Sequence, residues 1–486
     1  MKRCVLCFEA QPRKGTYRRL RLLVPSRFGE KAGATHEKCP LSFSPSGSVA
    51  AGANLLRIPV HVLYKGPTVI AAALFLLILS GPPRFRIRDP EASLRGDIDW
   101  VVILHAVVWG LAGLWVVWQL GSRFQAGRPL LRLRLPQILG LAMILALAVS
   151  AWRSDAPALT AFKVYQMLVS LLFTQIFAER FGVWTSLKTM LWGNALLCGA
   201  IAFCAFFVPD EVWTYSEFNP DPSRLFGGRI AATGVVSMLA IILLLTGVRK
   251  IWRVLPLALL ASLAAMLLAS LMRTAYITAF VFLALVLLKR PNIKPVRRLA
   301  YFLCAFLLFL YACGQLPSVS DYRDPASVSS LGDRVGLWRH LTAITLSRSP
   351  WLGLGYYSAS RIYGPEYNPG LGTAHSMFVE VLAGGGVLSF TLLIALCLTV
   401  SAYAIRLLYF KRDRLSFATS SLLLACFLFG SMGEEIDSGP VAVGFWYCAA
   451  VLPWLCAQPI RRSLALAVPH KTLPMGATVL PHPEAS

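Results

Sequence analysis

Charged residues are scarce in this sequence, and their scarcity excludes an ordinary water-soluble protein. Only 14% of the 486 residues are charged and 56% are hydrophobic, whereas a soluble domain has about 25% charged residues. The apolar residues form runs that recur along nearly the whole chain and leave little polar sequence between them. The sequence therefore predicts a single helical domain embedded in a membrane.

Several signatures of other protein classes are missing. The sequence contains no glycine-rich phosphate loop ending in lysine, no HExxH motif and no GxSxG motif, and nothing in it indicates ATP as an energy source. Most of the 11 cysteines lie within apolar runs and are expected to be small buried hydrophobes, so no disulfide framework is visible. The basic first residues lead into no apolar segment, and we expect no cleaved signal peptide.

Cysteine and histidine also occur close together in the N-terminal segment. Cys4, Cys7, His36 and Cys39 are residue types that bind zinc. Their surroundings are basic and lack a zinc-finger pattern, so we expect no metal there.

The net charge of +24 would suit a nucleic-acid-binding protein, but the positions of the basic residues argue against that role. Lysine and arginine concentrate in the tails and in short loops between apolar runs, and the positive-inside rule places such segments in the cytoplasm. We therefore expect no nucleic-acid partner. The stretch through Arg57 is predicted to be a cytoplasmic tail that is either solvated or in contact with anionic lipid head groups.

The apolar runs predict an all-α fold, namely a polytopic helical membrane protein with about twelve transmembrane helices of roughly 20 residues each. The spans are expected to begin near Pro67, Trp100, Leu135, Pro157, Leu187, Ile230, Leu255, Thr274, Leu299, Ser376, Leu415 and Val441. The arginine- and lysine-rich loops after the second, sixth, eighth and tenth spans then share the cytoplasmic side with both tails. One loop, with Arg84, Arg86, Arg88 and Arg95, falls on the other side.

This topology predicts three parts. Residues 1–60 form a basic cytoplasmic tail, residues 61–458 form the membrane domain, and residues 459–486 form a cytoplasmic C-terminal tail. The membrane domain includes a long external loop at 314–375, and long ordered loops usually carry function. Apolar residues at helical spacing from Asp333 to Leu346 predict an amphipathic helix on the outer membrane surface.

The external side also gathers cationic residues. Arg273 interrupts an apolar stretch. Because a charge in or beside lipid is costly, we expect it to have a function, the alternative being a side chain that snorkels to the interface. The other arginines on this side are Arg153, Arg224, Arg229 and Arg334. Guanidinium groups that converge suit a phosphate or pyrophosphate, because their planar fork binds such oxygens in pairs. Lys163, inside the fourth span, either snorkels or lines a polar cavity.

His375 stands at the external start of a predicted helix. The positive end of the helix dipole disfavours imidazolium, so we expect this side chain to be neutral near pH 7 and competent as a general base. A capping or interfacial role is the alternative. The acidic residues of the last external turn, Glu434, Glu435 and Asp437, are expected either to be solvated or to supply a second base or contacts to the acceptor.

Several short motifs follow one another in a fixed order along the external side. They are Gly332-Asp-Arg334 with Trp338, then Pro350-x-x-Gly353-x-Gly355, then Ala374-His375, then Gly384-Gly-Gly386. This order resembles the core signature of the O-antigen ligase and O-antigen polymerase superfamily. Ser270–Thr274 looks like that family's Ser-x-x-Arg element, and Arg224–Gly227 like its external Arg-x-x-Gly element. Ser376 and Gly384 depart from the asparagine and glutamate that the family often has.

The resemblance implies a metal-independent glycosyltransferase of the GT-C type in the bacterial inner membrane, without cofactor or nucleotide sugar. It implies an undecaprenyl-pyrophosphate-linked glycan as donor, a saccharide or lipid A–core as acceptor, and transfer on the periplasmic face. His375 would accept the acceptor's proton. Arg273 and Arg334 would bind the pyrophosphate, helped by Arg224, Arg229 and Arg153. The aromatic residues of the long loop would hold sugar rings.

Three alternatives stay open at this stage. Ligation and polymerisation share the fold and the motifs. A transporter or flippase of lipid-linked glycans would also combine many spans with cations for an anionic head group, although no internal repeat is visible. A non-catalytic membrane scaffold would not gather arginine and histidine on one face.

Overall fold

The computed structural model describes residues 66–80, 100–215, 223–227, 230–247, 254–289, 295–312, 334–368, 372–411, 413–433 and 436–458. Both predicted tails lie outside these residues, as do positions 314–333 of the long loop. The candidate zinc ligands Cys4, Cys7, His36 and Cys39 also lie outside them. The same holds for Arg229 and for Glu434 and Glu435.

The described part of the chain is almost entirely helical, which confirms the predicted all-α polytopic membrane fold. Seven helices of the described ranges are long and apolar enough to cross a membrane. They belong to α4 (Trp100–Gln125), α5 (Leu135–Ser150), α6 (Pro157–Phe181), α7 (Val183–Phe207), α17 (Met377–Phe410), α18 (Arg414–Met432) and α19 (Gly439–Ala457). Shorter apolar helices are α2 (Gly66–Ser80), α9 (Thr233–Gly247), α10 (Val254–Ala269) and α11 (Arg273–Lys289). With α12 (Pro295–Ala312), every predicted span coincides with a helix, and the number that crosses the membrane stays a prediction.

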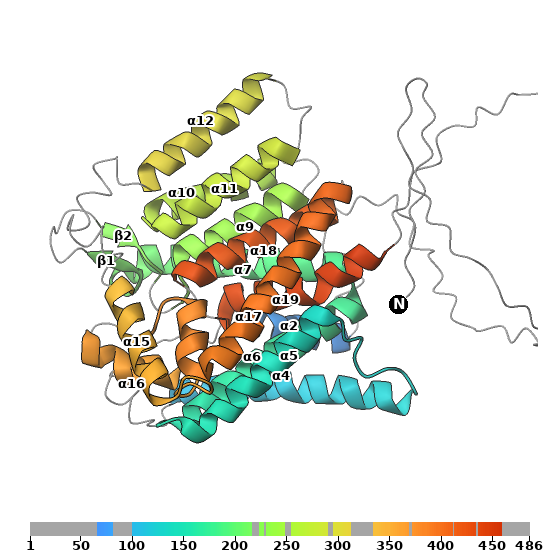
Figure 1. Ribbon diagram of the computed structural model, residues 1–486. Helices are drawn as coiled ribbons and strands as arrows, with labels where there is room; N and C mark the ends of the chain where they lie inside the picture. The colour runs from blue at the N-terminus through green and yellow to red at the C-terminus, as the bar shows by residue number, and fades with distance from the viewer. Residues whose placement is uncertain are drawn as a thin grey trace, which may run out of the picture. The chain divides into compact units, whose positions relative to one another are not determined.

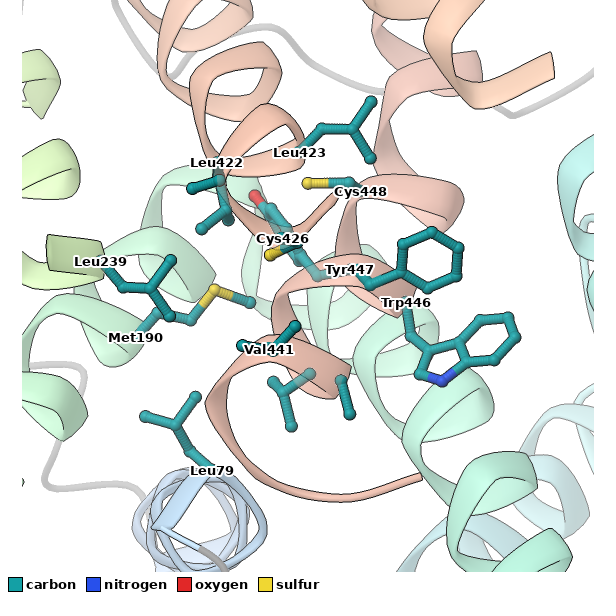
Figure 2. Packing of buried hydrophobic residues seen from close by; sticks show 14 of the residues in the cluster. Leu79, Met190, Leu239, Leu422, Leu423, Cys426, Val441, Trp446, Tyr447 and Cys448 are labelled. Atoms are coloured by element: carbon teal, nitrogen blue, oxygen red, sulfur yellow. The ribbon is translucent and has the colours of Figure 1, made fainter. Parts of the chain in front are cut away.

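The seven long helices are apolar on all sides, as expected for elements buried in a bundle or in lipid. Helix α17 packs along α5, and α19 packs between α18 and α6 (Figure 1). Cys426 of α18 and Tyr447 and Cys448 of α19 are fully buried at this contact (Figure 2). By contrast, α4 exposes Leu114 and Val117, which is the surface that lipid would cover.

Polar contacts at the helix ends define one basic face of the bundle. Arg123 at the end of α4 forms an ion pair with Glu179 of α6, with 2.7 Å between Nη1 and Oε2. Arg134 before α5 donates to the carbonyl oxygen of Pro453 in α19, over 2.7 Å. Lys411 after α17 donates to the carbonyl oxygen of Leu455. These basic residues come from the loops predicted to be cytoplasmic.

Short elements gather at the helix ends that the same topology places on the opposite side. They are η1 (Ala151–Arg153), α8 (Pro209–Val212), the antiparallel strands β1 (Trp213–Tyr215) and β2 (Ser223–Leu225), α15 (Arg334–Arg348) and α16 (Ser358–Tyr367). Hydroxyl contacts between Ser154 and Ser358, 2.6 Å apart, join the turn after η1 to α16. The long loop is thus attached to the bundle.

Helix α15 occupies the place of the predicted amphipathic helix, but its apolar face packs on protein. Leu337 and Leu341 are buried in a cluster with Leu354, Tyr363 and Ala383. The expectation that this face lies on the membrane surface is therefore wrong, because α16 and α17 already cover the same side chains.

The glycine motifs allow a loop to insert into a break in α17. Gly386 has φ 64° and ψ −167°, which interrupts the helix. The carbonyl oxygen of Ala383 then accepts from the nitrogen of Leu354 (2.9 Å), and the nitrogen of Val387 donates to Pro350 (2.8 Å). A Cβ on Gly384 would lie 2.4 Å from the Cα of Tyr356. Only glycine permits this backbone contact, which fixes the long loop beside the start of α17.

Candidate functional site

His375 lies in the short segment that enters α17. Its φ of 50° places it in the left-handed region, which is unusual for a non-glycine residue and is often found at functional sites. Thr373 Oγ1 lies 3.3 Å from the imidazole Nδ1. The side chain is partly buried next to the end of α18, where it interacts with the backbone of Gly433.

The surroundings keep His375 neutral. Burial, followed by the positive charge of Arg334, lowers its pKa from 6.5 to about 4, and Arg361 lowers it further, while the backbone of Gly433 acts in the opposite direction. A neutral imidazole near pH 7 agrees with the expectation from the sequence. The sequence argument attributed the neutral form to the helix dipole, whereas in the structure burial is the largest cause.

Arg334 is held beside His375 at the start of α15. Its guanidinium donates to the carbonyl oxygen of Met432, the residue before Gly433. Arg361 of α16 completes this cationic neighbourhood. It donates from Nη2 to the hydroxyl of Tyr357 over 2.7 Å, and its guanidinium lies 5.0 Å from the centre of that ring. Sequence reasoning missed Arg361, although it is a basic residue between two pieces of the recognised pattern.

Arg273 is the first residue of α11 and is partly buried. The turn before it contains Leu271 with φ 46°. Met272 in this turn reaches Gly433, where an added Cβ would lie 3.9 Å from the Met272 Cε. The Arg273 turn therefore adjoins the same end of α18 that interacts with His375 and Arg334.

Arg334 and Arg361 are the arginines whose charges act on His375 among the described residues. Arg224 in β2 donates from Nε to Thr214 Oγ1 over 3.1 Å and stands 4.6 Å from the Phe226 ring centre. Arg153 is exposed in η1, and its side chain forms no hydrogen bond or ion pair with any described residue. Arg229 is outside the described ranges.

A buried carboxylate supports the histidine segment. Glu380 in the first turn of α17 is fully buried, and it accepts hydrogen bonds from Ser360 Oγ (2.9 Å) and from the backbone nitrogen of Ala374 (3.2 Å). Trp338 Nε1 donates to the carbonyl oxygen of Ala374 over 2.7 Å. The sequence offered a signal for Glu380, because it is an acidic residue inside an apolar span.

Lys163 and Asp437 form a buried ion pair, with 2.6 Å between Nζ and Oδ2. Their side chains are 12% and 1% exposed. The expectation that Asp437 is solvated is therefore wrong, because its side chain is buried against Lys163 of α6. Lys163 is paired inside the protein and does not snorkel to the interface. Its ammonium also lies 4.0 Å from the ring centre of Tyr357.

The aromatic residues of the long loop separate into two groups. Tyr356, Tyr357 and Tyr363 are buried, so they belong to the packing of the loop. Trp351 is 69% exposed and Tyr367 is 40% exposed. Among the described rings of the loop, Trp351 and Tyr367 are the exposed ones, so the hypothesis that aromatic rings hold sugars concerns these two.

The apolar helical bundle is that of a multi-pass membrane protein. At one end of it, a neutral histidine beside guanidinium groups forms a site suited to an anionic ligand. Residues 257–394 match the family model described as O-antigen ligase. This part of the chain contains Arg273, Arg334 and His375, and the match confirms the resemblance to the O-antigen ligase and polymerase superfamily. A search of curated proteins finds no match to the chain.

Proposed function

We propose that this protein is a metal-independent membrane glycosyltransferase that uses an undecaprenyl-pyrophosphate-linked glycan as donor. It transfers or polymerises this glycan onto a hydroxyl of a saccharide or lipid A–core acceptor. The reaction takes place at the periplasmic face of the bacterial inner membrane and serves the synthesis of a surface polysaccharide. The observation that carries the proposal is a neutral His375 beside Arg334 and Arg361 within the O-antigen ligase domain.

His375 acts as the general base in this scheme. The acceptor oxygen attacks the anomeric carbon of the donor, and the bond between that carbon and the pyrophosphate oxygen breaks. The pyrophosphate leaves with the electron pair, and the acceptor proton passes to the imidazole. Binding of the anionic donor would offset the repulsion that Arg334 and Arg361 exert on the imidazolium. The pKa of His375 would therefore rise when the donor is in place.

The arginines bind the pyrophosphate and stabilise the charge that develops on it. Arg273 and Arg334 have the principal role, because both adjoin the end of α18 that interacts with His375. Fixed cations act strongly in a site that is partly shielded from water. Arg224, Arg229 and Arg153 would contact the outer part of the donor.

The basic residues at the other end of the bundle support a periplasmic placement of the site. Arg123, Arg134 and Lys411 gather there, and basic residues mark the cytoplasmic side. An outward site suits a lipid-linked donor that has already crossed the membrane.

The direct test is glycan transfer by the purified protein in the presence of a lipid-linked donor and a saccharide acceptor. His375→Ala should lose transfer by at least about 100-fold, in the range of general-base catalysis, while it still binds the donor. Near-normal transfer by this variant would remove the base role. Transport of the donor across proteoliposomes without any transfer would favour the flippase alternative.

A further inference from the structure

The Lys163–Asp437 pair is an unusual feature of the bundle interior. The two residues are 274 positions apart in the sequence and belong to α6 and to the turn between α18 and α19. Withdrawal of two charges from water is costly even when they are paired, and charges at membrane depth are usually functional. Stability alone is therefore a weak explanation for this pair.

The turn that carries Asp437 is held by further polar contacts. Ser170 Oγ donates to the carbonyl oxygen of Asp437 over 3.3 Å. Trp446 Nε1 donates to the carbonyl oxygen of Ile436 over 2.9 Å. The ion pair and these two hydrogen bonds fasten the turn to α6 and α19.

The same stretch of chain supports the candidate site. Met432, five positions before Asp437, accepts a hydrogen bond from Arg334. The next residue, Gly433, interacts through its backbone with His375. A shift of this turn would therefore move the backbone groups that hold both the proposed base and a proposed donor ligand.

Lys163 reaches the site by a second route through Tyr357. Its ammonium lies 4.0 Å from the centre of the Tyr357 ring, and the Tyr357 hydroxyl accepts from Arg361 over 2.7 Å. Tyr357 has φ 66°, a left-handed conformation that a bulky residue keeps only when its surroundings fix it. Lys163 is part of those surroundings.

We infer that Lys163 and Asp437 are positioning residues, which hold His375, Arg334 and Arg361 in their working arrangement from the α18–α19 turn and from Tyr357. This inference rests on the proposed glycosyl transfer. The two residues act through their neighbours and have no proposed contact with the reacting atoms.

The test compares Lys163→Met with Arg123→Met, which breaks the ion pair on the opposite face. For Lys163→Met we expect kcat to fall by about 10- to 100-fold, since a displacement of about 1 Å in a catalytic arrangement costs about 100-fold. The acid limb of the pH–rate profile should move to higher pH, because a loosened His375 becomes more accessible to water. Arg123→Met should keep both the wild-type kcat and the wild-type limb.

Two further variants separate positioning from folding. Asp437→Asn preserves the volume of the side chain and should reproduce the loss in kcat and the shifted limb. Lys163→Arg retains the positive charge and should be more active than Lys163→Met. A purely structural role would lower the yield of folded protein and the thermal midpoint without moving the acid limb.

The inference is overturned if Lys163→Met and Asp437→Asn, which each remove one charge of the pair, both keep the wild-type kcat and acid limb. It is equally overturned if neither of them folds while Arg123→Met does, because the pair is then a folding element. A separate result, full transfer by His375→Ala, would defeat the proposed base, and the two failures are therefore distinguishable.

Discussion

The carboxylate of Glu380 accepts a hydrogen bond from the backbone nitrogen of Ala374, over 3.2 Å, and so holds the peptide directly before His375. The carbonyl oxygen of Ala374 is held in turn by Trp338. Both polar groups of Ala374 are thus engaged by side chains from different helices. This arrangement fixes the left-handed backbone of His375 relative to α15 and α17.

Replacement of Glu380 by methionine should impair the site with little change in side-chain length. Methionine has no oxygen acceptor, so the backbone nitrogen of Ala374 loses its partner, and a buried donor left without its acceptor costs about 1–3 kcal/mol. We expect kcat for glycan transfer to fall by about 10-fold or more. Glu366→Met is the control, because the Glu366 side chain is 54% exposed, and it should transfer normally. Equal activity of the two variants would argue against this support of His375.

The contact between α17 and the loop at Gly353 and Gly355 predicts a strong effect of an added methyl group. Gly384→Ala would place its Cβ 2.4 Å from the Cα of Tyr356, and a backbone atom has little freedom to move. We expect a loss of about 3 kcal/mol, at the upper end of the penalties for overpacking. Gly199→Ala in α7 has nothing within 4 Å of its added Cβ, and it should be neutral or slightly stabilising. Thermal unfolding in detergent measures both, and an unchanged midpoint for Gly384→Ala would contradict the observed packing.

The layout of the long helices was accessible from the sequence, because these helices are continuous apolar runs bounded by charged or turn-forming residues. These patterns predicted that one helix starts next to Arg273 and another next to His375, where α11 and α17 begin. The order of short motifs then indicated the family, which the match at residues 257–394 supports.

The polar contacts were not accessible in the same way. Asp437 lies in a short acidic turn, and nothing local distinguishes a solvated carboxylate from one that pairs with Lys163 far away in the chain. The burial of Tyr357 and Tyr363 depends likewise on how the long loop packs. Such pairings are set by tertiary packing, which the local pattern of one segment does not contain.

Arg334 and Arg339 lie on the same helix and provide a matched pair for the proposed anion site. Arg334→Lys removes the planar fork that binds phosphate oxygens in pairs and also alters the contact with Met432. We expect a weaker apparent affinity for the lipid-linked donor, by about 10-fold, which corresponds to about 1.4 kcal/mol. Arg339 is exposed and lies five positions after Arg334 on α15, about 140° around the helix axis, so Arg339→Lys should bind as the wild type does. Donor titration of both variants decides the matter, and an equal affinity would remove Arg334 from the proposed site.

The lowered pKa of His375 predicts how stability depends on pH. In the unfolded chain a histidine titrates near 6.5, whereas in the folded protein the pKa of His375 is about 4. Between these values the unfolded state binds more protons, so the free energy of unfolding falls as the pH falls from about 6.5 to about 4. The full contribution of this residue is present above pH 6.5 and amounts to about 3 kcal/mol.

His375→Gln should remove this part of the pH dependence, since glutamine does not titrate. Thermal midpoints in detergent between pH 7 and pH 4 should therefore fall less steeply for His375→Gln than for the wild type. His340→Gln is the control, because His340 lies on α15 and is 29% exposed, and it leaves the buried imidazole in place. The variant His340→Gln should retain the wild-type slope. Identical slopes for the wild type and His375→Gln would mean that the folded protein does not hold this imidazole in its neutral form.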